Sequence, residues 1–251
     1  MSGPPHGRYD RTARAVDKLA AMTSPDVRSF LDVPVVLLDL DGTIVDSGPG
    51  ILDSFAHAFA ECGVPLPPPA VLRTFLGPPL EESFRDVLGL SEERSDQLRS
   101  AYGDHYRKNG LRTATPYAGI ADLVRALTGA GRTVAVATNK RETTAQSLLG
   151  HLGLEGLFAL IGGTDPEAGR SGKAAVIGSV LERLDVRTGA GDVAGTARAV
   201  MVGDRLHDAD GAAAHGLPAI LVGWGYGGSP ERESDLPRAD SVEDLARMLL
   251  R

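Results

Sequence analysis

Five short apolar runs rich in β-branched residues recur along the 251-residue chain, and they limit its fold more than any other feature. They cover residues 33–41, where the run ends in two acids, and residues 133–138, 157–161, 199–203 and 219–222. Near-continuous runs of this kind suit strands that are covered on both faces, as in a parallel sheet. Helical patterns separate most of these runs, at 120–129, 143–152, 173–184 and 208–215. The alternation predicts an α/β fold with a doubly wound, Rossmann-like parallel sheet as its core.

The connection between the first and second runs is far longer than one crossover needs, at roughly ninety residues. Most of it has a helical pattern, at 51–62, 70–75, 80–88 and 91–107. We therefore expect an inserted all-helical cap domain at residues 50–115, with hinges at 46–50 and 112–116. The α/β catalytic core would then comprise residues 33–49 and 116–251, after an N-terminal extension at residues 1–32.

The composition excludes several classes of protein. With 26 basic and 33 acidic residues, the net charge of −7 argues against a broad nucleic-acid-binding face and favours small metabolites as partners. The single cysteine, Cys62, excludes an intramolecular disulfide and a thiolate zinc cage. No apolar run approaches the ~20 residues of a membrane span, and the first ten residues lack the apolar centre of a secretory signal. We expect a cytoplasmic protein, and the composition leaves its oligomeric state undetermined.

Reactive side chains follow three of the predicted strands. The first strand leads into Asp39 and Asp41, the second ends in Thr138, and the fourth leads into Asp204 and Asp208. Ligands of open α/β sheets bind beyond the carboxyl ends of the strands. The sequence therefore predicts one site at this edge of the sheet.

Oxygen ligands dominate that predicted site. Asp39, the backbone carbonyl of Asp41 and Asp204 would offer an all-oxygen environment, which suits Mg²⁺ completed by water and phosphate. Asp208 lies in the first turn of the next predicted helix, where capping of that helix is an alternative role. Lys140 follows Thr138 by two positions, and the sequence leaves a solvated loop lysine and a site lysine equally open.

These residues carry a family resemblance. Asp39-Leu-Asp-Gly-Thr-Ile-Val-Asp-Ser47, Thr138, Lys173 and Gly203-Asp-Arg-x-x-Asp208 resemble the four signature motifs of the haloacid-dehalogenase-like hydrolase superfamily. The resemblance covers most of residues 33–248. The segments Asp46-Ser-Gly-Pro49, Gly77-Pro-Pro-Leu80 and Pro116-Tyr-Ala-Gly119 are most similar to the phosphoglycolate-phosphatase group, which carries a helical cap.

The resemblance implies a role for each matched residue. Asp39 would be the nucleophile that forms an aspartyl-phosphate, and Asp41 would protonate the leaving oxygen and then activate water. Lys173 would pair with Asp39 and with the transferred phosphoryl group. The implied phosphate-binding residues are Gly42, Thr138, Asn139 and Lys173. The implied metal-binding residues are Asp39, Asp41, Asp204 and Asp208.

We therefore expect a Mg²⁺-dependent phosphomonoesterase that acts on a small phosphorylated metabolite, either phosphoglycolate-like or a sugar phosphate. The charges agree, because a phosphate dianion repels a carboxylate nucleophile unless cations offset the repulsion. A phosphomutase, or a metabolite- or protein-binding module without turnover, remains an alternative. A dehalogenase is disfavoured by the acid at Asp41. A phosphonate-cleaving enzyme is disfavoured because Lys108, the one lysine in residues 50–115, lies near the hinge.

Overall fold

The computed structural model describes residues 30–78, 80, 83–186 and 197–250. Most of the predicted N-terminal extension therefore lies outside the described residues. Its last part is described, and Phe30 is fully buried in the hydrophobic core. The guanidinium of Arg132 donates a hydrogen bond to the carbonyl of Phe30 at 3.0 Å, which ties this segment to the start of the sheet.

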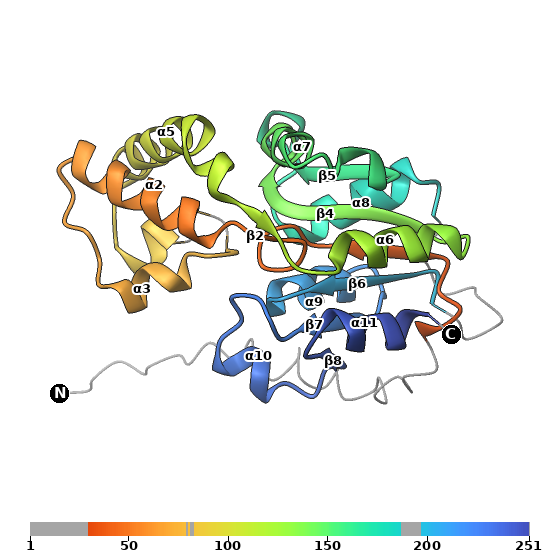
Figure 1. Cartoon of the computed structure of the whole chain (residues 1–251). Coiled ribbons are helices and arrows are strands. Elements are labelled where there is room, and N and C mark those ends of the chain that lie inside the picture. The colour runs from red at the N-terminus through yellow and green to blue at the C-terminus, as the bar shows by residue number, and fades with distance from the viewer. Residues whose placement is uncertain (1–29, 79, 81–82, 187–196, 251) are drawn as a thin grey trace, which may run out of the picture.

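Six parallel strands form the central sheet, which confirms the predicted α/β fold (Figure 1). They are β1 (Val35–Leu38), β4 (Thr133–Arg141), β5 (Leu160–Thr164), β6 (Ala199–Gly203), β7 (Ala219–Val222) and β8 (Arg238–Ala239). Their order is β5-β4-β1-β6-β7-β8. The chain thus builds outward from β1 on one side and then returns to build on the other. The direction of winding reverses at β1, and the site is expected at such a reversal.

Helices cover both faces of this sheet. They are α6 (Ile120–Gly129), α7 (Glu142–His151), α8 (Lys173–Arg183), α9 (Leu206–Ala213) and α11 (Val242–Leu249), with the short α10 at Ser229–Glu233. Val36 and Leu38 of β1 pack with α6, α7 and α11, whereas Val35 and Leu37 pack with α8 and α9. Successive side chains of a strand point to opposite faces, so a strand covered on both faces must be apolar throughout.

The inserted segment forms a helical group beside the sheet (Figure 1). Its helices are α2 (Gly48–Glu61), α3 (Pro69–Thr74) and α5 (Glu92–Lys108), with a π-helical turn at Ser83–Val87 and a 3-10 turn at Gly110–Thr113. They enclose a core of their own, in which the ring of Phe55 lies edge-on to the rings of Phe75 and Phe84. The bounds of the cap and core domains remain predictions.

A two-stranded ribbon lies where the chain enters and leaves this helical group. β2 (Val45–Asp46) pairs antiparallel with β3 (Thr115–Pro116), and both strands fall at or beside the predicted hinges. A second link joins the group to the core, because Arg205 donates a hydrogen bond to the carbonyl of Leu76 at 2.9 Å. Among the described residues, no helix has the length and apolar character needed to cross a membrane.

Candidate active site

β1 pairs in register with β4 on one side and with β6 on the other, and β4 continues beyond the end of β1. Leu38 of β1 is in register with Val136 of β4 and with Val202 of β6. Asp39 follows β1 directly, and its amide donates a hydrogen bond to the carbonyl of Val202 at 2.9 Å. The register therefore brings the residues after β1 and β6 close to one another, beside the later part of β4.

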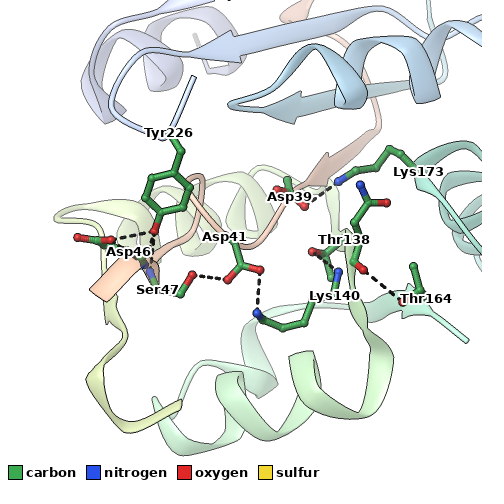
Figure 2. Close-up of polar contacts among 11 residues, drawn as sticks. Asp39, Asp41, Asp46, Ser47, Thr138, Lys140, Thr164, Lys173 and Tyr226 are labelled. Atoms are coloured by element: carbon green, nitrogen blue, oxygen red, sulfur yellow. Dashed lines mark hydrogen bonds and ion pairs between the residues drawn. The ribbon is translucent and has the colours of Figure 1, made fainter. Parts of the chain in front are cut away.

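Lys173 joins two of the acids. It begins α8, and its ammonium lies 2.7 Å from Oδ1 of Asp39 and 2.6 Å from Oδ1 of Asp208. The ammonium also donates a hydrogen bond to the carbonyl of Ala137 at 2.9 Å. Figure 2 shows the side chain reaching across to Asp39. Lys173 is 7% exposed, so these interactions form with little competition from water.

Three buried acids form a group that could hold a metal ion. Each of Asp39, Asp204 and Asp208 offers a carboxylate oxygen within 4.8 Å of the others. Oδ2 of Asp204 accepts a hydrogen bond from the amide of Tyr226 at 2.6 Å, while the buried Oδ1 has no hydrogen-bond partner among the described residues. Three carboxylates against one lysine leave an excess of two negative charges when all are ionised. A hard divalent cation fits this donor set and this charge.

Burial and repulsion raise the pKa values of Asp39 and Asp204. Burial raises the pKa of Asp39 to about 6; the charge of Lys173 opposes this rise, and that of Asp208 adds to it. Burial, followed by repulsion from Asp208 and Asp39, raises the pKa of Asp204 well above its usual value. For Lys173, burial lowers the pKa, but the attraction of Asp208 and Asp39 outweighs it and the net change is upward. Asp39 and Asp204 are thus destabilised as anions, and Lys173 is stabilised as a cation.

Asp208 has a second contact that bears on its alternative role. Its Oδ2 accepts a hydrogen bond from the amide of Arg205 at 3.1 Å, at the start of α9. One oxygen therefore caps the helix while the other meets Lys173. The capping role and the site role are both present in one side chain.

The carboxylate of Asp41 faces away from these acids, toward different partners (Figure 2). Its Oδ2 lies 2.9 Å from the ammonium of Lys140, and its Oδ1 accepts a hydrogen bond from the hydroxyl of Ser47. The two side chains of the Asp-x-Asp pair are thus directed to separate lysines. Burial lowers the pKa of Lys140, but the attraction of Asp41 together with the smaller contributions of Tyr106 and Tyr102 outweighs it, so the net change is upward. The role of Asp41 in metal binding stays a prediction.

Gly42 allows the first and fourth strand ends to approach closely. Its φ is +80°, in the region that favours glycine, and a Cβ atom there would lie 2.3 Å from Oδ2 of Asp204. Its amide donates a hydrogen bond to the carbonyl of Val45 at 2.9 Å. The close approach of Asp204 therefore explains why a glycine stands at position 42. Its contact with phosphate stays a prediction.

Two further predicted phosphate ligands lie at the end of β4. The hydroxyl of Thr138 is buried and accepts a hydrogen bond from the amide of Lys140 at 3.2 Å. The carbonyl of Asn139 accepts a hydrogen bond from the hydroxyl of Thr164 at 3.2 Å (Figure 2). The amide oxygen of the Asn139 side chain is buried and has no hydrogen-bond partner among the described residues. The contacts of Thr138 and Asn139 with phosphate stay predictions.

Two residues of the site were not assigned a function from the sequence. Lys140 was left open, and the structure places its ammonium beside Asp41, at the end of a strand that continues to Arg141. The pairing of β4 with β5 shifts register between Ala137 and Arg141, so strand alternation alone could not have placed this side chain. The hydroxyl of Tyr226 accepts hydrogen bonds from the amides of Ser47 and Gly48 at 2.8 and 2.7 Å and donates to Asp46 at 2.8 Å. No local sequence pattern indicates these contacts, because 178 or more residues separate Tyr226 from its partners.

Comparisons with known proteins agree with this geometry. A family model described as haloacid dehalogenase-like hydrolase matches residues 36–222. Tyrosine-protein kinase PtkA of Mycobacterium tuberculosis is 40% identical over 193 residues, which cover 77% of this chain and 63% of the kinase. The match thus spans less than two thirds of that relative's length. A 5'-nucleotidase of Pseudomonas aeruginosa is 33% identical over 82% of this chain and 90% of its own.

Two further similarities bear on the narrower resemblance and on the fold. A phosphoglycolate phosphatase of Mesorhizobium japonicum is 32% identical over 77% of this chain and 84% of its own. The crystal structure of a predicted phosphatase from Clostridium acetobutylicum superposes with a TM-score of 0.77 at 30% identity, covering 86% of this chain and 97% of the other. The resemblance inferred from the motifs is confirmed, and the chain belongs to the haloacid dehalogenase-like hydrolase family.

Proposed function

We propose that the protein is a Mg²⁺-dependent phosphomonoesterase that hydrolyses a small phosphorylated metabolite through an aspartyl-phosphate. The contact that carries this proposal is the placement of Lys173 between Asp39 and Asp208, at 2.7 and 2.6 Å. It puts a fixed positive charge beside a buried carboxylate and beside the candidate cation ligands. A carboxylate can attack a phosphate dianion only where such charges offset the repulsion between them.

Asp39, Asp204 and Asp208 would hold the cation, as the excess negative charge and the unpartnered oxygen of Asp204 support. When bound, Mg²⁺ would supply positive charge that balances the acids and the phosphoryl oxygens. Lys173 would supply further positive charge beside Asp39 and Asp208. The buried hydroxyl of Thr138 would donate a hydrogen bond to a phosphoryl oxygen.

In the first step, an oxygen of Asp39 forms a bond to phosphorus while the bond from phosphorus to the leaving oxygen breaks. The electron pair of that bond stays on the leaving oxygen, which takes a proton from Asp41. In the second step, a water oxygen attacks phosphorus and gives its proton to Asp41. The phosphorus–oxygen bond to Asp39 then breaks, which restores the carboxylate and releases inorganic phosphate.

The proposed substrate class is a small phosphate monoester, with phosphoglycolate-like compounds and sugar phosphates as its first members. The relatives named phosphoglycolate phosphatase and 5'-nucleotidase support this class and add nucleoside monophosphates to it. A shared site can serve different alcohols, because the groups around Asp39 contact the phosphoryl part that all of these compounds have in common.

The test is phosphate release from a panel of 2-phosphoglycolate, sugar phosphates and nucleoside monophosphates, with Mg²⁺ present. We expect release from at least one compound, and loss of that release with EDTA or in Asp39→Asn. Release that is undiminished by EDTA or by Asp39→Asn contradicts the proposal. An isomerised sugar phosphate without free phosphate would identify a mutase. Binding of beryllofluoride without turnover would identify a binding module.

Phosphorylation of protein tyrosine is a second candidate, supported by the 40% identity to a relative named tyrosine-protein kinase. Incubation of the protein with ATP and a tyrosine-containing peptide, followed by mass spectrometry of the peptide, tests it. Phosphopeptide formed by the wild-type protein and lost in Asp39→Asn would favour this activity over hydrolysis.

A further inference from the structure

We propose that Lys140 is a positioning residue for the acid–base group Asp41, and that Tyr106 of the inserted helix α5 fixes Lys140 in place. This inference rests on the proposed phosphatase function and assigns part of it to a residue outside the four motifs. The orientation of the Asp41 carboxylate would therefore depend on the contact between helix α5 and the end of strand β4.

Asp41 is fastened at both oxygens. The ammonium of Lys140 lies 2.9 Å from Oδ2, and Ser47 donates its hydroxyl hydrogen to Oδ1. The side chains of Lys140 and Asp41 are 9% and 12% exposed, so water competes little with either contact. Two fixed donors on a planar group restrict its rotation, and one alone does not.

Lys140 is itself held by an aromatic ring from another part of the chain. Its ammonium lies 4.5 Å from the centroid of the Tyr106 ring, which is cation–π distance. The Tyr106 ring stacks on Tyr102 at 5.7 Å, and Tyr102 stacks on Phe55 at 4.7 Å. The lysine therefore rests on a column of rings that runs through the core of the inserted helices.

The two lysines of the site serve different carboxylates. Lys173 contacts Asp39 and Asp208, whereas Lys140 contacts Asp41 (Figure 2). One pair thus supports attack at phosphorus, and the other supports proton transfer to the leaving oxygen. As Asp41 gives up its proton, negative charge develops on its carboxylate beside the ammonium of Lys140. A fixed cation there stabilises that charge without rearrangement.

A pair of esters with different leaving groups tests this assignment. Benzyl phosphate releases an alkoxide that must be protonated, whereas p-nitrophenyl phosphate releases a stable anion that needs no proton. The value kcat/KM reports the steps up to the first bond cleavage. We expect Lys140→Met to lower kcat/KM for benzyl phosphate about 100-fold, the lower range of general acid–base effects, and for p-nitrophenyl phosphate less than about 3-fold.

The hydrolysis step gives a second readout. Both esters form the same aspartyl-phosphate, whose breakdown needs Asp41 as a base. In Lys140→Met, we expect kcat and KM for p-nitrophenyl phosphate to fall together, which leaves their ratio nearly unchanged. A purely structural defect does not produce this pattern. Lys140→Arg, which keeps the charge, should recover part of the benzyl phosphate activity.

Two further variants separate positioning from folding. Tyr106→Leu keeps an apolar side chain but removes the ring, and we expect it to lower benzyl phosphate turnover selectively, by about 10-fold. Lys108→Met is the matched control, because this lysine ends the same helix and is exposed. This variant should leave kcat/KM unchanged for both esters. Thermal unfolding of each variant shows whether the protein is folded.

The outcomes are distinct. Equal loss of kcat/KM on both esters in folded Lys140→Met would place Lys140 on the phosphoryl group and overturn the inference. No loss on either ester would overturn it as well. If Lys140→Met does not fold, the same comparison of kcat/KM between the two esters is made with Tyr106→Leu and Lys140→Arg, and it tests the inference in the same way. Absence of phosphate release by the wild-type protein from both esters and from the metabolite panel would instead refute the proposed function.

Discussion

Asp39→Asn should stabilise the metal-free protein while abolishing its turnover. Asp39 lies in a buried group with Asp204 and Asp208, and Lys173 offsets part of their charge. Burial is the main reason that the pKa of Asp39 rises to about 6. An asparagine has nearly the same shape and no charge, so the folded state no longer bears the cost of a buried anion.

The magnitude follows from the pKa of Asp39. A rise from 3.8 to about 6 corresponds to about 3 kcal/mol between the folded and unfolded states. Below about pH 4, Asp39 is protonated in both states of the wild-type protein, so the two proteins should be equally stable. Between about pH 4 and pH 6, the unfolded chain releases the proton first, and the wild-type protein loses stability as the pH rises. Above about pH 6 the full difference remains, which is about 6–12 °C in Tm for a chain of this size.

The assay is thermal unfolding followed by circular dichroism, in EDTA, from pH 4 to pH 8. Asp210→Asn is the matched control, because this carboxylate is exposed on α9 and its replacement should leave Tm nearly unchanged. Adding Mg²⁺ should reverse the order of stability, because the wild-type protein offers one more carboxylate to the cation. An Asp39→Asn protein that is less stable than the wild type in EDTA at pH 7 would refute the electrostatic reasoning.

Three other substitutions test the surroundings of the acids. Lys173→Met should lower the free energy of unfolding in EDTA by about 3–5 kcal/mol, because it leaves buried anions unpaired; urea denaturation measures this, and a change under about 1 kcal/mol would contradict it. Gly42→Ala should cost about 1–3 kcal/mol, since its φ is +80° and the new methyl group would meet Asp204 at 2.3 Å; unchanged unfolding would show that this strand end is free to move. Tyr226→Phe should cost about 1–3 kcal/mol by leaving the amide of Ser47 without its acceptor, whereas the amide of Gly48 keeps its hydrogen bond to Asp46; the same denaturation experiment checks it, and no loss would mean that another acceptor replaces the phenol.

Much of the sheet could be predicted because its strands are buried on both faces. The runs at 199–203 and 219–222 are the observed bounds of β6 and β7, and the helical pattern at 120–129 is α6. The predicted strand bounds were less accurate beside a tight turn and for very short strands. β5 begins at Leu160 and not at Leu157, because residues 155–157 form a 3-10 turn before it. The two-residue strands β2, β3 and β8 are too short to produce any pattern in the sequence.

Some residues of the candidate site could likewise be placed from the sequence, and others could not. Asp39, Asp204 and Asp208 could be placed together from the sequence, because parallel strands in register end at one edge of the sheet. The partners of Asp41 could not be placed, because Lys140 comes from β4 and its supporting ring comes from α5. Such a contact depends on how the inserted helices meet the sheet, and periodicity carries no information about that.

The ribbon of β2 and β3 has a consequence for how this architecture can change. Val45 pairs with Pro116 and Asp46 with Thr115, so the chain departs from the sheet and comes back at adjacent points. A segment whose two ends already touch can be lengthened, shortened or exchanged without moving its attachment, as with modules spliced into a host protein. The inserted segment could therefore change in length between Asp46 and Thr115 while the sheet and its strand ends keep their places.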